Sequence, residues 1–201
     1  MTDAIVHVVD DDQSIRSSLV RLLRTAGFEA RAYASAGEFL MGSRRDGPGC
    51  IVLDVNMPGP SGLDLHAALM KQGDSIPVVF LSGRGDIPMS VQAMKGGAVD
   101  FLTKPVKSAD LLGAVRAALA RDAEYRERGV QLRDVRARRE SLTEREREVF
   151  ARVTEGRLNK QIAAELGTSE RTIKAHRARV MQKMAVRTVA ELIRAADQLK
   201  A

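Results

Sequence analysis

Acidic, hydroxyl and basic side chains lie at the ends of four short apolar runs in the first half of the chain. Asp10 and Asp11 come directly after the first run, and Asp54 closes a later one. Ser82 and Lys104 stand at the ends of two further runs. If these runs are parallel strands, their carboxyl ends meet at one edge of a sheet. We therefore expect these side chains to converge.

The types of these side chains indicate phosphoryl chemistry assisted by a metal ion. Carboxylates packed together need a compensating cation, and oxygen ligands of this type suit Mg²⁺. Asp54 is the natural nucleophile, because a carboxylate that attacks phosphorus forms an aspartyl phosphate. Mg²⁺ and the Lys104 ammonium would neutralise the charge of the transferring phosphoryl group. The cluster therefore predicts a site for an anion that is bound through a metal.

Each of these residues also has a purely structural interpretation. Acidic residues at strand ends often cap the following helix, and we expect Asp12 to do so. Lys104 alone would be a surface lysine, Ser82 alone a turn residue, and His7 a packed histidine inside a strand. Single residues therefore favour a structural role, but their combination at four strand ends favours a functional site.

The elements that must position these residues alternate between strand-like and helical patterns through residue 120. Short apolar runs are typical of buried strands, and stretches with apolar residues at helical spacing separate them. This alternation implies an α/β fold, a parallel sheet with helices on both faces. The expected strands are 5–9, 28–33, 50–54, 78–82 and 99–103, and the expected helices are 15–23, 36–41, 63–70, 91–95 and 109–120.

Length and composition allow two modest domains and exclude several classes of protein. The chain has 201 residues, of which 44% are hydrophobic and 29% charged, as is typical of a soluble globular protein. No apolar run approaches the ~18 residues of a membrane span, and the N-terminus lacks the pattern of a signal peptide. The single cysteine, Cys50, excludes an internal disulfide. We therefore expect a cytoplasmic protein with no membrane partner.

Charge separates the two halves of the chain. Residues 1–120 carry 12 basic and 13 acidic side chains, residues 121–201 carry 20 and 13, and the net charge is +6. The positive excess suggests a polyanionic partner for the second half alone. Residues 121–140 are dense in charge, and we expect a partly helical linker there, interrupted near Gly129. From Leu142 onward the pattern predicts three or four helices.

Four motifs make the first part of the chain similar to the receiver domain of bacterial two-component response regulators. The resemblance covers roughly residues 3–120 and implies a flavodoxin-like sheet of five parallel strands in the order 2-1-3-4-5. It also implies phosphorylation by a cognate sensor histidine kinase. The motifs are Val8-Val9-Asp10-Asp11-Asp12, Asp54-Val55-Asn56-Met57-Pro58-Gly59, Leu81-Ser82-Gly83 and Lys104-Pro105.

The same resemblance implies a role for each residue of the cluster. Asp54 would accept the phosphoryl group, and Ser82 and Lys104 would hold its oxygens. A cis bond before Pro105 would aim Lys104 into the site. The Mg²⁺ ligands that the resemblance implies are Asp10 through a water molecule, Asp11, Asp54 and the backbone carbonyl of Asn56.

Three further positions bear on how such a receiver would switch. Phe101 stands where many relatives carry a tyrosine, so packing alone must report the phosphorylated state. Asn56 and Arg84 occupy positions that tune the lifetime of the phosphoryl group in this family. We expect Arg84→Ala to change the rate of dephosphorylation.

The second half resembles the LuxR-type helix-turn-helix DNA-binding domain over residues 142–196. Thr143 and Glu146 form a capping-box pattern, and Gly167-Thr168 is a turn between two helices. The matching segments are 142–149, 156, 159–163, 166–169 and 171–177. Ile162, Ala163 and Leu166 are expected to pack against Ile173, Val180 and Met184, with Lys174, Arg177 and Ala178 on the opposite face.

The second helix of such a unit enters the major groove of double-stranded DNA with its early residues at base edges. Residues 157–184 include seven basic and two acidic side chains, a surface suited to phosphates. The family match assigns Lys174, Ala175 and Ala178 to base edges, and the small Ala178 makes direct readout sparse. The residues expected to contact the DNA backbone are Asn159, Lys160, Thr172, His176 and Arg177.

A receiver followed by a LuxR-type domain resembles the NarL/FixJ class of response regulators, and segments 6–11 and 85–95 resemble its FixJ-like branch. In that branch the face of the fourth helix and fifth strand forms a homodimer on phosphorylation. Val91, Met94 and Lys95 are the corresponding residues here. The class implies promoter binding and contact with RNA polymerase. The expected domains are a receiver over 1–120, a linker over 121–140 and a helix-turn-helix domain over 141–201.

Other functions are open to the same residues. Asp54-Val55-Asn56 faintly resembles an aspartate-nucleophile phosphatase, but Asn56 cannot donate the proton that such an enzyme needs. We therefore expect no enzymatic activity beyond the receiver's own phosphoryl transfer and slow dephosphorylation. The chain could instead bind DNA without phosphorylation and use its receiver for docking, although degenerate receivers usually lose an acid or the lysine. A merely solvated basic face is less favoured, because the turn, the caps and the full motif are present.

Overall fold

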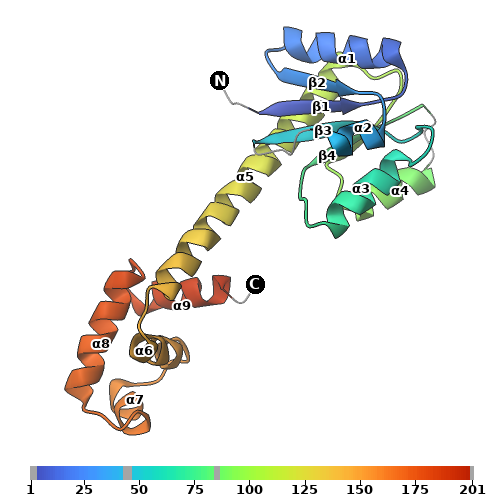
Figure 1. Ribbon diagram of the computed structural model, residues 1–201. Helices are drawn as coiled ribbons and strands as arrows, with labels where there is room; N and C mark the ends of the chain where they lie inside the picture. The colour runs from blue at the N-terminus through green and yellow to red at the C-terminus, as the bar shows by residue number, and fades with distance from the viewer. Residues whose placement is uncertain (1–3, 43–46, 84–86, 200–201) are drawn as a thin grey trace. The chain divides into compact units, whose positions relative to one another are not determined.

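The computed structural model describes residues 4–42, 47–83 and 87–199 and divides the chain into two compact units. The first unit is Met1–Arg126 and the second is Glu127–Ala201, and Figure 1 colours the chain from blue to red along its length. Within the described ranges, no helix combines the length and the apolar character that crossing a membrane requires.

Among the described residues, five parallel strands form the sheet of the first unit. Their order is β2-β1-β3-β4-β5, and Ile5 of β1 therefore pairs with both Glu29 and Gly49. This order confirms the flavodoxin-like arrangement that the resemblance implied. The strands are β1 (Ile5–Val9), β2 (Glu29–Tyr33), β3 (Gly49–Asp54), β4 (Val78–Ser82) and β5 (Asp100–Thr103).

Helices cover both faces of this sheet, because successive side chains of a strand point to opposite faces. Val8 and Val52 lie in one core with residues of α1 and α5, whereas Ile51 and Phe80 lie in another with residues of α2, α3 and α4. Asp12 caps α1, as predicted. The helices of this unit are α1 (Gln13–Thr25), α2 (Ala36–Met41), α3 (Gly62–Lys71), α4 (Ile87–Lys95) and the part of α5 (Ser108–Glu140) that precedes Glu127.

Helix α5 runs without a break from Ser108 to Glu140, so the predicted interruption near Gly129 is wrong. A glycine inside a helix costs only about 1 kcal/mol relative to alanine. The residues around it are mostly Arg, Glu, Gln and Leu, which are strong helix formers. Gln131 also donates from Nε2 to Oε1 of Glu127, one turn earlier, at 3.4 Å. Together, the helix preferences of these neighbours outweigh the free-energy cost of Gly129.

Asp122 fixes α5 to the amino end of β3. Its carboxylate is buried, and Oδ2 accepts hydrogen bonds from the backbone N–H of Gly49 and from Nε of Arg126, both at 2.8 Å. Arg126 also donates to the backbone carbonyl of Gly47. A Cβ at Gly49 would lie 2.3 Å from the carbonyl oxygen of Ile5, so this close packing requires glycine.

The described part of the second unit is built around a core in which α7 packs against α8. Ile162, Ile173 and Val180 are fully buried there, and Leu166 packs at the margin. The predicted packing between these two helices is confirmed. Besides the last turns of α5, the helices of this unit are α6 (Glu144–Thr154), α7 (Asn159–Glu165), α8 (Glu170–Lys183) and α9 (Val189–Gln198).

Thr143 and Glu146 form the predicted capping box at the start of α6, each side chain accepting a hydrogen bond from the other residue's backbone N–H. Glu146 is buried, and Nζ of Lys183 lies 2.7 Å from its Oε2. The hydrogen bonds from Lys183 and from Thr143 hold the pKa of Glu146 below its ordinary value of 4.5. A carboxylate whose pKa falls on folding stabilises the fold above its ordinary pKa. That stabilisation is lost as the pH falls through the lower folded-state pKa.

We expect Glu146→Gln to lower the free energy of unfolding of the second unit by about 1 kcal/mol at neutral pH, because the charge-assisted hydrogen bond to Lys183 is lost. The difference should shrink as the pH falls from 4.5 through the lower pKa of folded Glu146, because the folded wild type then also loses this charge. Urea unfolding followed by circular dichroism measures both effects. Glu144→Gln is the control, since Glu144 is exposed in the same turn. Equal destabilisation by the two substitutions would contradict the prediction.

Candidate functional site

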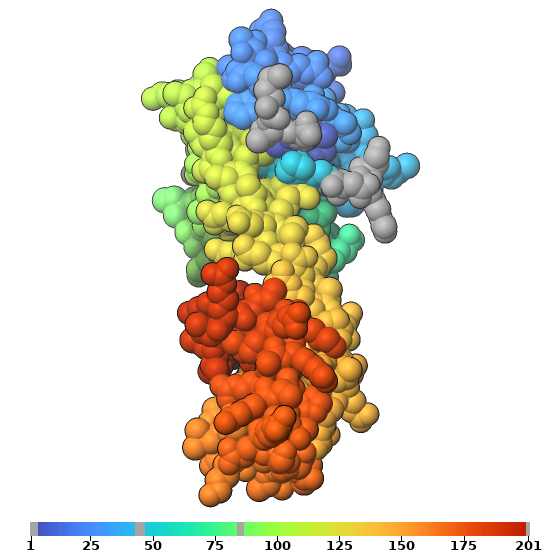
Figure 2. Space-filling view, turned by 90° about the vertical axis from the view of Figure 1, so that its left-hand side faces the viewer, coloured from blue at the N-terminus to red at the C-terminus, as the bar shows by residue number. Residues whose placement is uncertain are grey.

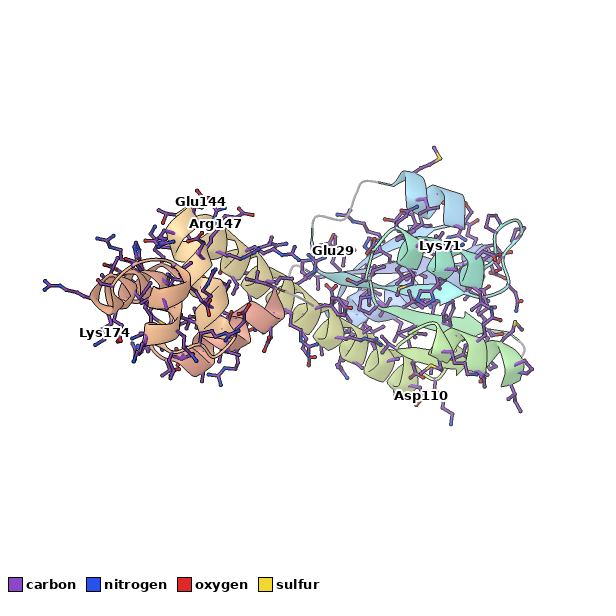
Figure 3. All side chains as sticks on the ribbon, turned by 90° about the horizontal axis from the view of Figure 1, so that it is seen from below. Glu29, Lys71, Asp110, Glu144, Arg147 and Lys174 are labelled. Carbon is purple, nitrogen blue, oxygen red and sulfur yellow. The ribbon has the colours of Figure 1, made fainter. Side chains whose placement is uncertain are left out.

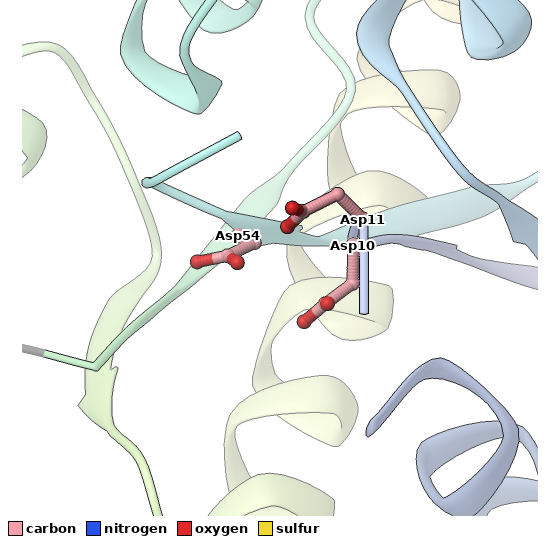
Figure 4. A group of neighbouring side chains, drawn as sticks. All are labelled: Asp10, Asp11 and Asp54. Atoms are coloured by element: carbon pink, nitrogen blue, oxygen red, sulfur yellow. The ribbon is translucent and has the colours of Figure 1, made fainter. Parts of the chain in front are cut away.

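The carboxyl ends of the strands bring three of the predicted acidic residues together. Asp10 follows β1, Asp54 is the last residue of β3, and Figure 4 shows their carboxylates beside that of Asp11. One oxygen from each residue lies within 4.8 Å of the others. Asp10 and Asp54 are buried, whereas Asp11 is exposed. Buried carboxylates this close together need a compensating positive charge.

Lys104 supplies that charge from the end of β5. Its Nζ donates to Oδ2 of Asp10 at 2.7 Å and to Oδ2 of Asp54 at 2.8 Å. Its backbone N–H donates to the carbonyl of Ser82 at 2.8 Å. The peptide bond between Lys104 and Pro105 is cis, as the resemblance implied. Lys104 therefore connects the ends of β1, β3, β4 and β5.

Burial and hydrogen bonding act in opposite directions on these groups. Burial raises the pKa of Asp10 above its ordinary value, although Lys104 and the backbone N–H of Asp12 both donate to this carboxylate. Burial lowers the pKa of Lys104, but hydrogen bonds to Asp10 and Asp54 outweigh it, and the pKa lies above its ordinary value. Lys104 is therefore an ammonium at neutral pH and can hold an anion beside Asp54.

The chemistry of the donors makes this cluster suitable for Mg²⁺. Carboxylate oxygens are the hard ligands that this ion takes. Oδ1 of Asp10 accepts the backbone N–H of Asp12 at 2.9 Å, and Oδ1 of Asp54 accepts that of Asn56 at 3.2 Å. These bonds hold the two buried carboxylates in place, while Asp11 is open to solvent. The residues present therefore fit the ion that the resemblance implies.

Ser82 and Phe101 lie on the neighbouring strands β4 and β5. Ser82 is buried at the end of β4 and pairs with Thr103 of β5. Phe101 is half-buried against the core that α3 and α4 cover, with its ring centroid 6.4 Å from that of Phe80. Its side chain therefore makes packing contacts here, and its role in reporting the phosphorylated state stays a prediction. Arg84 lies outside the described residues.

The sequence predicted the environment of His7 but not the contact that Arg16 makes. Arg16 of α1 donates from Nη1 to the backbone carbonyl of Asp10 at 2.5 Å, and no motif pointed to it. An arginine in the first turns of an amphipathic helix is normally a solvated residue, so its spacing carried no signal. His7 is buried against the rings of Tyr33 and Phe39, as predicted for a packed histidine.

The outer side of α8 is a second candidate surface. Lys174, Ala175 and Ala178 are exposed there, opposite the buried Ile173 and Val180. In Figure 2 the orange-red side chains of α8 cover the front of the second unit, and Figure 3 labels Lys174 at its surface. The three residues assigned to base edges therefore share one accessible stripe.

The residues assigned to the DNA backbone are less uniformly exposed. The prediction that Arg177 lies on the outer face is wrong, because this residue lies on the side of α8 that faces α7. It is half-buried, and its Nη1 donates to Oδ1 of Asn159 at 2.8 Å. His176 is half-buried, and its Nδ1 is buried with no hydrogen-bond partner among the described residues. Lys160 is exposed, and Thr172 is half-buried.

Two family models match the chain, one for each unit. The response regulator receiver domain matches residues 6–116, which include nearly all of the sheet and the carboxylate cluster. The luxR family of bacterial regulatory proteins matches residues 140–196, which include α6 to α8 and most of α9. The two matches together cover both candidate surfaces.

Known proteins resemble the chain over nearly its whole length. It is 48% identical to nodulation protein W of Bradyrhizobium diazoefficiens over 198 residues, which are 98% of this chain and 87% of the relative. It is 44% identical to the transcriptional regulatory protein FixJ of Azorhizobium caulinodans over 95% of this chain and 90% of the relative. The solved structure of the response regulator StyR matches with a TM-score of 0.84 and 44% identity, over 97% of this chain and 98% of that one.

Proposed function

Since the chain belongs to the two-component response regulators that join a receiver domain to a LuxR-family DNA-binding domain, we propose that phosphorylation of Asp54 switches its binding to promoter DNA. A sensor histidine kinase donates the phosphoryl group. The observation that carries the proposal is the Lys104 ammonium, 2.8 Å from Oδ2 of Asp54 at the carboxyl edge of the sheet. An ammonium there supports an anion on this carboxylate. The kinase transfers its phosphoryl group in the cytoplasm, where the DNA also lies. We therefore propose that the protein is cytoplasmic.

Asp54 acts as the nucleophile toward the phosphoryl donor. One carboxylate oxygen forms a bond to phosphorus while the bond from phosphorus to the kinase histidine nitrogen breaks. Lys104 then donates to a phosphoryl oxygen instead of to the free carboxylate, and the hydroxyl of Ser82 donates to another. Burial of Asp54 strengthens these interactions, because charges attract more strongly where water is excluded.

Asp10, Asp11, Asp54 and the backbone carbonyl of Asn56 would hold Mg²⁺ at this edge of the sheet. When bound, the ion neutralises charge on the phosphoryl oxygens. The chain itself supplies orientation, because the backbone N–H groups of Asp12 and Asn56 hold the carboxylates of Asp10 and Asp54. The attacking carboxylate is therefore held in place before the donor arrives.

Packing transmits the phosphorylated state to the face of α4 and β5. Ser82 moves toward the phosphoryl group, and Phe101 repacks into the space that it leaves. The change favours a homodimer through Val91, Met94 and Lys95. Val91 is 46% exposed and Met94 is 48% exposed, which supports an apolar contact on α4. Phosphorylation thus selects the dimeric state.

Dimerisation strengthens DNA binding, because the second domain binds at a high effective concentration once the first has bound. The two helix-turn-helix domains contact half-sites about one helical turn apart. Lys174, Ala175 and Ala178 meet base edges, and a regulator bound at a promoter contacts RNA polymerase. The residues that we assign to the DNA backbone are Asn159, Lys160, Thr172, His176 and Arg177, the first and last of which also join α7 to α8.

We expect Met94→Asp to prevent dimerisation of the phosphorylated protein, raising the dimer dissociation constant by about 30-fold or more, because a buried carboxylate without a partner is costly. Analytical ultracentrifugation after treatment with Mg²⁺ and acetyl phosphate measures this. Met70→Asp is the matched control, since Met70 on α3 is 50% exposed and lies outside the proposed face. Equal dimerisation of the wild type and Met94→Asp would show that another face is used.

The alternative is a regulator that binds DNA without phosphorylation and uses its receiver for docking. The cluster at the carboxyl edge of the sheet argues against this alternative, because docking alone needs none of Asp10, Asp11, Asp54 and Lys104. DNA affinity with and without acetyl phosphate, for the wild type and for Asp54→Ala, separates the two functions. A gain confined to the wild type supports the switch, whereas equal affinity in all four samples supports docking.

A further inference from the structure

The outer stripe of α8 contains one residue more than the family match assigned. Arg171, Lys174, Ala175 and Ala178 are all exposed, and their spacing places them on one side of the helix. Burial fixes this phase, because Ile173 and Val180 are fully buried on the other side. Arg171 lies in the first turn, the part of a recognition helix that reaches base edges.

The chemistry of the stripe makes Arg171 its best reader of sequence. The methyl groups of Ala175 and Ala178 can contact a thymine methyl but cannot donate hydrogen bonds. Lys174 is a flexible point charge, whereas Arg171 carries a planar fork of donors. That fork matches O6 and N7 of guanine in the major groove.

Arg171 is also free to make such a contact. Among the described residues it forms no hydrogen bond or ion pair, whereas Nη1 of Arg177 on the same helix donates to Oδ1 of Asn159 at 2.8 Å. Ser169 fixes the start of α8 by accepting the backbone N–H of Thr172 at 3.2 Å. The start of α8 is therefore capped, while the guanidinium of Arg171 remains available.

We propose that Arg171 reads a guanine in each half-site and is a specificity-determining residue of this regulator. The proposal rests on the proposed function, because it requires α8 to enter the major groove. It makes Arg171, with Lys174, the source of hydrogen-bonded base readout, and leaves apolar contacts to Ala175 and Ala178. One G·C pair per half-site should therefore depend on this side chain.

The test is selection of bound duplexes from a random-sequence DNA pool by the full-length protein, treated with Mg²⁺ and acetyl phosphate. Arg171→Ala should select the wild-type motif without its preference at one G·C pair per half-site. Its affinity for the wild-type motif should fall by about 5- to 150-fold. Replacing that G·C pair by A·T should weaken wild-type binding by a similar factor and leave binding by Arg171→Ala almost unchanged.

Arg179→Ala is the matched control on the same helix. Arg179 is exposed and, in the described part of the chain, has no ion pair, but it lies outside the stripe. Arg179→Ala should weaken binding to all duplexes by the same factor and should still select the wild-type motif, since a phosphate contact carries no base preference. Both arginines are exposed, so thermal melts should match the wild type.

Two outcomes would overturn the assignment of Arg171. Arg171→Ala could select the full motif, or it could bind all duplexes more weakly by the same factor, as expected for the loss of a phosphate contact. A wild-type protein that selects no motif and gains no affinity from acetyl phosphate would instead overturn the proposed function. The failure of the inference and the failure of the function it rests on are therefore distinguishable.

Discussion

Asp54→Ala is expected to abolish the single phosphoryl adduct that the wild-type protein acquires from acetyl phosphate and Mg²⁺. Asp54 alone among the three clustered acids is both buried and the last residue of a central strand, with Lys104 2.8 Å from its Oδ2. Asp10 is also buried, and Lys104 and a backbone N–H hold its two oxygens as they hold those of Asp54, but Asp10 follows β1 and is not part of a strand. Asp11 is exposed and has no ammonium beside it among the described residues.

Intact mass spectrometry of wild type and Asp54→Ala measures the adduct directly. Asp110→Ala is the control, because Asp110 is an exposed acid in the first turn of α5 and should leave the adduct unchanged. An adduct of equal abundance on Asp54→Ala would assign phosphorylation to another residue. An adduct on neither protein would require the kinase as donor, and the comparison would be repeated with a histidine-kinase phosphodonor.

Lys104→Met is expected to lower the free energy of unfolding of the first unit by about 3 kcal/mol in the absence of divalent cations. Methionine fills much of the lysine volume but removes the charge that compensates two carboxylates. The side chains of Asp10 and Asp54 are only 1% and 6% exposed, so water cannot replace the ammonium. Two buried carboxylates without a cation repel each other and lose their hydrogen-bond donor.

Urea unfolding in a buffer with a chelator measures this loss, followed by circular dichroism. Lys107→Met is the matched control, because Lys107 is exposed close by in the sequence and should change stability by less than about 0.5 kcal/mol. The loss for Lys104→Met should diminish at lower pH, where one of the carboxylates takes up a proton. Equal stability of Lys104→Met and the wild type would show that Lys104 does not compensate the cluster.

The sheet and the carboxylate cluster were predictable because both depend on short-range signals. Strands β3 and β4 are mainly apolar runs, and a parallel sheet places the residues at the ends of its strands on one edge. Asp10, Asp54 and Lys104 are separated widely in sequence, but their positions relative to the strand ends fixed where they meet. The helix cap at Asp12 followed in the same way from local backbone geometry.

The structure differs from the predictions where several weak effects compete, or where the phase of a helix decides which way a side chain faces. Gly129 predicted a break, but one glycine is outweighed by many helix-forming neighbours in α5. Arg177 was predicted to face outward, but its position on α8 turns it toward Asn159. Arg16 contacts a backbone carbonyl, an interaction that no residue pattern encodes. Such contacts depend on tertiary packing, which sequence spacing describes only approximately.

The most direct test of the central claim is the DNA affinity of the full-length protein before and after stoichiometric phosphorylation. Phosphorylated wild type should bind a selected duplex about 5- to 150-fold more tightly at the same salt concentration, the range of typical coupling between two sites. Asp54→Ala should show no gain after the same treatment. An unchanged affinity of fully phosphorylated wild type, or an equal gain in Asp54→Ala, would contradict the claim that Asp54 controls DNA binding.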